Sequence, residues 1–258
     1  MYTATGTDTG ITALTDSQGK TTFTLPGGSY RFQANHEGQL FWSGDLTVTP
    51  DQTIHTTIST GGGSYVLSVT NGTVGIAGVK TMLFSAPGSY LNQSVTTSST
   101  GEAAYNLADG SYRVTANYLG YEYSTDPFTV PLITTQTLAI PHLAQTVSVV
   151  RSYQNNRVAM ANIEATLCTV DGTPLGLSAA TGADGTLQWS LPAQAYAVQA
   201  RYLGRTYLSE PFTSGNPTVL IPEGLARVTL LQGGAALPNT QVVAISDSDP
   251  DHPQSLTS

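Results

Sequence analysis

Charged side chains are scarce in this sequence. Asp, Glu, Lys and Arg make up 10% of the 258 residues, and the formal net charge at pH 7 is −8. Lys20 and Lys80 are its two lysines. A protein that binds nucleic acid or an anionic membrane surface needs clustered basic side chains to meet the phosphates. The composition therefore predicts that neither nucleic acid nor a membrane surface is a partner.

Cysteine and long apolar runs are also nearly missing. Cys168 is the single cysteine, so no disulfide can form within the chain, and its place in an alternating apolar run predicts a buried, unreactive thiol. No apolar run approaches the length that a membrane-spanning helix needs, and no signal-peptide pattern follows Met1. These features predict a chain that does not insert into a membrane.

Helical periodicity is absent, and strand periodicity takes its place. Thr21–Leu25, Ser29–Ala34 and Asp45–Thr49 alternate apolar and polar residues, which predicts half-buried strands. Turn sequences such as Asp16–Gly19 and Asp109-Gly110 separate runs of this kind. The pattern predicts an all-β protein.

One pattern of glycine and aromatic residues occurs three times. Gly19, Tyr30, Gly38 and Phe41 recur with unchanged spacing as Gly101, Tyr112, Gly120 and Tyr123, and once more as Gly185, Tyr196, Gly204 and Tyr207. The interval between successive copies of the pattern, which we call the repeat period, is too long for the unit of a helical solenoid and fits one small β-domain. The recurring aromatics are expected to pack the core of each domain.

The period predicts four segments: an incomplete repeat over residues 1–60, complete repeats over 64–142 and 143–222, and the opening strands of an incomplete repeat over 224–258. The first repeat is expected to start late, with Tyr2–Thr5 corresponding to Thr81–Phe84 of the second, so that its first strand is missing. Ala226–Leu231 and Leu237–Ile245 match the opening strands of the complete repeats.

The order of these motifs resembles a known family. Thr15–Gly19, then Phe23-Thr24-Leu25-Pro26, Gly28 and Tyr30, with their counterparts in Gly101–Tyr112 and Gly185–Tyr196, are similar to carboxypeptidase regulatory-like or transthyretin-like domains, relatives of the Cna-B-like stalk repeats of extracellular bacterial and archaeal proteins. The resemblance implies tandem seven-stranded Greek-key β-sandwiches of Ig-like type. It is informative about fold and poor in information about function.

The sequence contains few of the residue patterns that catalysis requires. The four histidines form no ligand pair, and no Gly-x-Ser-x-Gly motif exists, so no catalytic residue is expected. Asp247, Asp249 and Asp251 alternate as the first ligands of a calcium loop do, but His252 stands where such a loop needs glycine. We expect no cofactor, with calcium at these aspartates as the alternative to a solvated acidic loop. Trp42 beside Phe41 is expected to point outward and to contact a glycan or a neighbouring protein.

The incomplete repeats suggest assembly. A sandwich that lacks a strand leaves an unpaired edge, so the C-terminal strands of one copy are expected to complete the N-terminal repeat of the next copy, head to tail. The expected assembly residues are Tyr2, Ala4, Val228, Leu230, Val242 and Ala244. The rival interpretation is that these residues are a window on a longer repeat protein.

The sequence therefore predicts a non-catalytic structural protein, extracellular or on the cell surface, that forms a stalk or filament. Two alternatives remain: a carbohydrate- or protein-binding adhesin module, and accessory domains of a secreted hydrolase.

Overall fold

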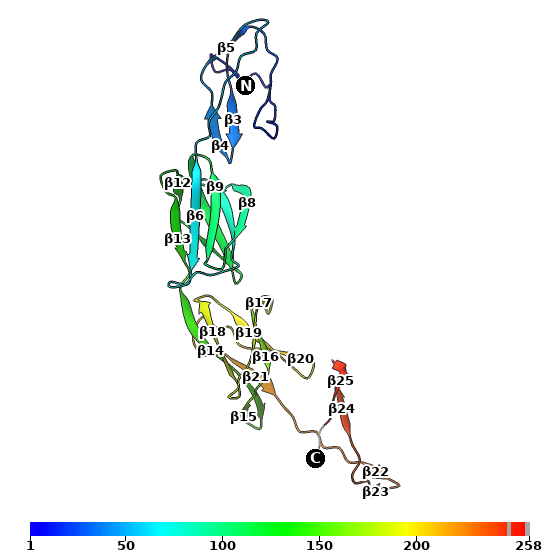
Figure 1. The fold of residues 1–258 in the computed structure, drawn as a ribbon. Helices are drawn as coiled ribbons and strands as arrows, with labels where there is room; N and C mark the ends of the chain where they lie inside the picture. Colours follow the sequence, from blue (N-terminus) through cyan, green and yellow to red (C-terminus); the bar gives the residue numbers. More distant parts are fainter. Residues whose placement is uncertain (247–248, 256–258) are drawn as a thin grey trace. The chain divides into compact units, whose positions relative to one another are not determined.

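The structure, a computed structural model, describes residues 1–246 and 249–255 (Figure 1). All regular elements in these ranges are β-strands, as the sequence predicts. In the same residues no helix long and apolar enough to cross a membrane is found. The chain divides into two compact units: residues 1–118 with 122–139, and residues 119–121 with 140–258.

The second repeat forms a β-sandwich within the first unit. Its strands are β6 (Gly63–Thr70), β7 (Lys80–Ser85), β8 (Tyr90–Thr96), β9 (Glu102–Leu107), β10 (Gly110–Tyr118), β11 (Tyr121–Ser124), β12 (Phe128–Val130) and β13 (Thr135–Ala139). One sheet has the order β13-β6-β9, and the other has β11-β10-β7-β8 with β12 also paired to β10. Because β11 and β12 share the edge of β10 opposite β7, the arrangement is the predicted seven-stranded sandwich with one strand interrupted.

The middle position of β6 makes it essential to its sheet (Figure 1). It pairs antiparallel with β9, with Tyr65 opposite Tyr105, and parallel with β13, with Leu67 opposite Gln136. Without β6, both neighbours would lose the partner for their backbone N–H and C=O groups.

The side chains between the two sheets explain why the aromatic residues recur. The rings of Tyr65 and Phe128 stack with centroids 3.9 Å apart, and Tyr112 packs on Phe128 at 6.1 Å. The Tyr112 hydroxyl donates to the Ala108 carbonyl oxygen at 3.0 Å. The buried Thr81 hydroxyl donates to the Val95 carbonyl at 2.7 Å and shares a 2.6 Å hydrogen bond with the Tyr105 hydroxyl. Buried polar atoms with partners of this kind carry little energetic cost.

The third repeat forms a second sandwich on the same plan. Its strands are β14 (His142–Tyr153), β15 (Asn156–Ala159), β16 (Glu164–Cys168), β17 (Pro174–Ala180), β18 (Thr186–Pro192), β19 (Ala197–Tyr202), β20 (Arg205–Leu208) and β21 (Thr218–Pro222). The central strand β14 pairs antiparallel with β18 and parallel with β21, as β6 does with β9 and β13. Cys168 is buried and free, as predicted, and burial raises the pKa of its thiol.

The first repeat forms far less structure. It contains β1 (Tyr2–Thr3), β2 (Gly28–Arg31), β3 (Gln33–His36), β4 (Gln39–Trp42) and β5 (Leu46–Val48), arranged as the sheet β1-β2-β5 and the hairpin β3-β4. Thr21–Leu25, which the sequence predicts as a strand, is not in a strand. The prediction fails there because a period-two pattern forms a strand only where a partner strand is present.

Strand register corrects the expected correspondence at the N-terminus. Tyr2 lies opposite Arg31, as Phe84 lies opposite Arg113 in the second repeat. Tyr2 therefore corresponds to Phe84, and buried Met1 corresponds to buried Leu83. Ala4 lies in the turn that follows β1.

The recurring glycine gives a test of how differently the first two repeats are packed. Gly101 and Gly19 both have positive φ, 83° and 73°. A Cβ at Gly101 would lie 2.6 Å from Gly75 Cα and 2.6 Å from the Val69 oxygen, whereas a Cβ at Gly19 would meet nothing within 4 Å. We expect Gly101→Ala to lower the free energy of unfolding by about 3 kcal/mol and Gly19→Ala by about 1 kcal/mol or less. Urea unfolding monitored by circular dichroism measures both, and equal effects would contradict the difference in packing.

The chain after Pro222 adds short hairpins. They are β22 (Leu231–Gln232) with β23 (Ala235–Ala236), and β24 (Val243–Ser246) with β25 (Asp249–Ser255). Residues 224–230, which include most of the strand expected over Ala226–Leu231, are not in a strand. As at Thr21–Leu25, the sequence pattern is present and a partner strand is not.

Candidate assembly surfaces

The first repeat lacks the strands of the second sheet of the sandwich. In the second repeat this sheet is β13-β6-β9. By the repeat period, residues 20–25 correspond to β9 and residues 53–57 to β13, yet both segments lack strand pairing. We call these two segments, with the face of β2 that they border, the acceptor.

Side chains of the acceptor are more exposed than the corresponding side chains of the second repeat. Tyr105 and Leu107 of β9 are buried, whereas Phe23 and Leu25 are only half-buried. The core tyrosine is fully buried as Tyr112 in the second repeat and only partly buried as Tyr30 in the first. An apolar surface that two sister repeats bury is therefore accessible in the first.

A second accessible apolar surface is the segment of residues 224–231, which we call the donor; its last residue, Leu231, pairs with Ala236 in the β22–β23 hairpin. Val228 is 67% exposed, and Leu230 and Leu231 are exposed as well. The donor corresponds in sequence to β6 and β14, with Val228 at the position of Leu67 and Leu230 at that of Val69. The side chains of Leu67 and Val69 are fully buried in the second repeat. The donor is thus a core strand by sequence and solvent-exposed in the structure.

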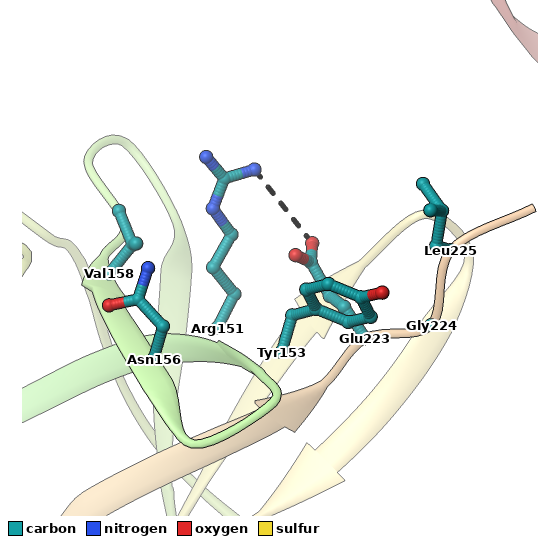
Figure 2. Close-up of a pocket in the computed structure, with 7 residues that line it drawn as sticks. All are labelled: Arg151, Tyr153, Asn156, Val158, Glu223, Gly224 and Leu225. Carbon is teal, nitrogen blue, oxygen red and sulfur yellow. Dashed lines mark ion pairs between the residues drawn. The ribbon is translucent and has the colours of Figure 1, made fainter.

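The donor leaves the third repeat at a fixed point (Figure 2). The Glu223 N–H donates to the Ser152 carbonyl at 2.8 Å, and the Glu223 carboxylate lies 3.9 Å from Arg151 Nη1. With Tyr153 and Asn156 these residues line a shallow pocket, at whose edge Leu225 is exposed. The sandwich therefore holds the chain up to Glu223 and releases it from Gly224 onward.

The other predicted assembly residues lie in different segments of the chain. Tyr2 lies in β1, Val242 is exposed, and Ala244 lies in β24. The predicted calcium loop falls largely outside the described residues: Asp247 is not described, and of Asp249 and Asp251 only the backbone is. Among the residues whose side chains are described, no group of three His, Cys, Asp or Glu side chains could hold a metal ion.

Trp42 has neighbours within its own repeat. Its ring is partly exposed, packs on Tyr2 with centroids 4.9 Å apart, and lies 5.2 Å from the Arg31 guanidinium carbon. Arg31 Nε in turn lies 3.4 Å from an Asp45 carboxylate oxygen. Packing and cation–π contact hold the indole in place. The glycan or protein contact at Trp42 stays a prediction.

A third feature, the turn between β3 and β4, was not predicted from the sequence. Glu37, at its tip, has a positive φ of 52° and a side chain that is 7% exposed. Its carboxylate accepts hydrogen bonds from the Ala108 N–H at 2.8 Å, the Tyr112 hydroxyl at 3.3 Å and Gln93 Nε2 at 2.5 Å. We call such a turn a knob and the residues that receive it a socket. A glutamate in a turn is usually solvated, and only long-range contacts reveal this one as buried.

Removing the Glu37 charge tests the importance of this knob. Glu37→Ala would leave the buried Ala108 N–H and the half-buried Gln93 amide without their acceptor, and we expect a loss of about 2–3 kcal/mol in stability. Glu37→Gln keeps one acceptor oxygen and should lose less. Hydrogen exchange at the Ala108 amide reports the lost bond directly, and unchanged protection there in Glu37→Ala would contradict the assignment.

Comparison with known proteins yields distant structural likeness. No protein-family model and no curated protein matches this chain. Among solved structures, it is similar to the TIE protein of Bacillus anthracis (14% identity, 81% of this chain and 44% of that one, TM-score 0.32). It is also similar to GBS52, the minor pilin of Streptococcus agalactiae (15% identity, 66% of this chain and 99% of that one, TM-score 0.34), and to the shaft pilin SpaA of Lactobacillus rhamnosus GG (10% identity, 64% and 100%, TM-score 0.33).

The chain thus matches less than half the length of the TIE protein. The all-β sandwich fold rests on the strand pairing described above.

Proposed function

We propose that this chain is a non-catalytic structural protein, extracellular or on the cell surface, whose copies join head to tail into a stalk or filament. The observation that carries the proposal is the correspondence between donor and acceptor. The acceptor lacks a central strand between residues 20–25 and 53–57, and the donor has the sequence of that strand, although its residues 224–230 are not in a strand.

The second repeat supplies the register of the proposed pairing. Tyr65 and Leu67 of β6 lie opposite Tyr105 and Ala103 of β9. Transferred by the repeat period, Ala226 would lie opposite Phe23 and Val228 opposite Thr21 of a second copy. On the other side, Val228 would pair in parallel with Ile54, as Leu67 does with Gln136. A strand inserted in this way gains backbone hydrogen bonds on both edges and buries its alternate side chains.

Sparse charge, abundant turns and the lack of helices in the described part of the chain suit a spacer better than a catalyst. The proposed interface is heterologous. Such contacts do not close on themselves, so they extend into an open array.

Light scattering of the purified chain across a concentration series, followed by electron microscopy, tests the proposal. The expected result is a molar mass that grows with concentration and fibres one chain wide. A chain that stays monomeric at the highest attainable concentration would disprove head-to-tail assembly, as would closed dimers.

A further inference from the structure

The knob of the first repeat has a counterpart in the second unit. The turn Leu119–Tyr121, which corresponds to Glu37–Gln39, packs on the sandwich core there, and the Tyr121 hydroxyl donates to the Ala195 carbonyl at 2.5 Å. Tyr121 also meets Tyr196 edge-on with ring centroids 5.6 Å apart. Each turn therefore packs near a core tyrosine: the Glu37 turn near Tyr112 and the Leu119–Tyr121 turn near Tyr196.

The residues that contact the two turns occupy corresponding positions of the repeat. A Cβ at Gly38 would lie 3.2 Å from Leu91 Cδ2 and 3.8 Å from Ser85 Cβ. A Cβ at Gly120 would lie 3.0 Å from Leu175 Cδ2 and 3.8 Å from Thr169 Cγ2. Leu175 and Thr169 follow Leu91 and Ser85 by one repeat period, the same interval that separates Gly185 from Gly101. The same docking geometry is thus used twice.

Chemistry at the sockets matches the knob that each receives. The Glu37 knob meets a socket that offers the Ala108 N–H and the Gln93 amide. Where the knob is Leu119, the position of Ala108 is taken by Pro192, which has no N–H, and that of Gln93 by Leu177. A charged knob is paired with hydrogen-bond donors, and an apolar knob with an apolar socket.

The third knob, Leu203, has no socket among the described residues. It is 42% exposed at the turn between β19 and β20, whereas its counterpart Leu119 is half-buried. The first repeat, conversely, has a socket that receives no knob from the part of the chain that the structure describes. The repeat period places Thr9, Ile11, Pro26 and Tyr30 at the positions of Leu91, Gln93, Ala108 and Tyr112, and the bridge between Tyr2 and Asp8 confirms that register.

We infer that Leu203 of one copy docks on the Ile11–Pro26 socket of the next copy, by the contact that Leu119 makes in the second unit. The chemical match decides the partner: Leu203 is apolar, and this socket has proline and isoleucine where the Leu119 socket has proline and leucine. The inference rests on the proposed head-to-tail assembly and adds a second contact to it. Strand insertion supplies most of the buried surface, and the knob fixes the angle between consecutive copies.

Cross-linking between separate variants tests which residues meet. Leu203→Cys and Ile11→Cys chains are mixed and treated with a short bismaleimide, with Leu208→Cys as the control because Leu208 is exposed to a similar extent, 46%. The expected product is a covalent dimer in the Leu203→Cys mixture and about tenfold less in the Leu208→Cys mixture. Equal yields from the two mixtures would overturn the inference.

A compensating exchange tests the chemical match. Leu203→Glu should raise the concentration at which chains assemble about tenfold, since the carboxylate would face Pro26 and Ile11 without a donor. Adding Ile11→Gln and Pro26→Ala rebuilds the Glu37 socket and should restore most of the loss. If wild-type chains assemble and Leu203→Glu chains assemble equally well, the knob contact is wrong and the strand insertion stands. If wild-type chains remain monomeric, both fail.

Discussion

Lysine at position 228 should abolish assembly and leave the fold of each chain intact. Val228 is exposed and belongs to neither sandwich, so Val228→Lys changes nothing that holds the free chain together. In the proposed joint the same side chain occupies the place of fully buried Leu67, where an unpaired ammonium group costs several kcal/mol. We expect the dissociation constant between copies to rise by more than about 100-fold, which corresponds to roughly 3 kcal/mol.

The complementary variant makes this prediction specific to a head-to-tail joint. Phe23→Asp should disable the acceptor as Val228→Lys disables the donor. Each variant by itself should be monomeric, and an equal mixture should form dimers that grow no further, because each chain still has one working end. Analytical ultracentrifugation resolves monomer, dimer and longer species.

Two substitutions on the opposite strand faces serve as controls. Thr229→Lys and Thr22→Asp place the same charges at positions that correspond to Ser68 and Ala104, whose side chains point away from the core. Both should assemble as wild type. Loss of assembly in these controls would show that charge near the segments, and not core insertion, causes the effect.

The second large effect is expected at the recurring core tyrosine. Tyr196 is 1% exposed and packs among Tyr121 and Phe212, so Tyr196→Ala should cost about 3–5 kcal/mol of the stability of its sandwich. Tyr30 occupies the same position of the repeat but is only partly buried, and in monomeric chains Tyr30→Ala should cost about 1 kcal/mol or less.

Assembly should raise the energetic cost of Tyr30→Ala relative to that of Tyr196→Ala. If the donor covers the acceptor, Tyr30 becomes a core residue like Tyr112, and Tyr30→Ala should weaken assembly while leaving the unfolding of the other repeats unchanged. Differential scanning calorimetry at low and high protein concentration measures this. A Tyr30→Ala chain that assembles with wild-type affinity would argue against a closed core in the first repeat.

Much of the architecture could be predicted from the sequence, because the same short residue patterns recur at a long interval. The recurrence of Gly101 and Gly185 follows from backbone conformations that glycine adopts without strain, and that of Tyr112 and Tyr196 from core positions. Strand predictions succeeded where a partner strand exists and failed at Thr21–Leu25, where the same alternation has none.

The candidate surfaces were predicted less completely. The sequence identified Val228 and Leu230 as strand residues outside the two complete repeats, because they match β6 and β14. The Tyr2 correspondence was misplaced, since residues 1–3 are too few to fix a register without the pairing to Arg31. The knobs were missed altogether: Glu37 differs in chemistry from Leu119 and Leu203, and the contacts that the Glu37 turn and the Leu119–Tyr121 turn make join residues far apart in the sequence.

The sequence by itself determined the all-β class, the period and the positions of turns and core aromatics, because these depend on local alternation and on residues with special backbone conformations. Tertiary structure decided which strands form, which apolar faces stay open and where each turn docks. The reason is that a strand is stable only with a partner, and a side chain is buried only by what lies across from it.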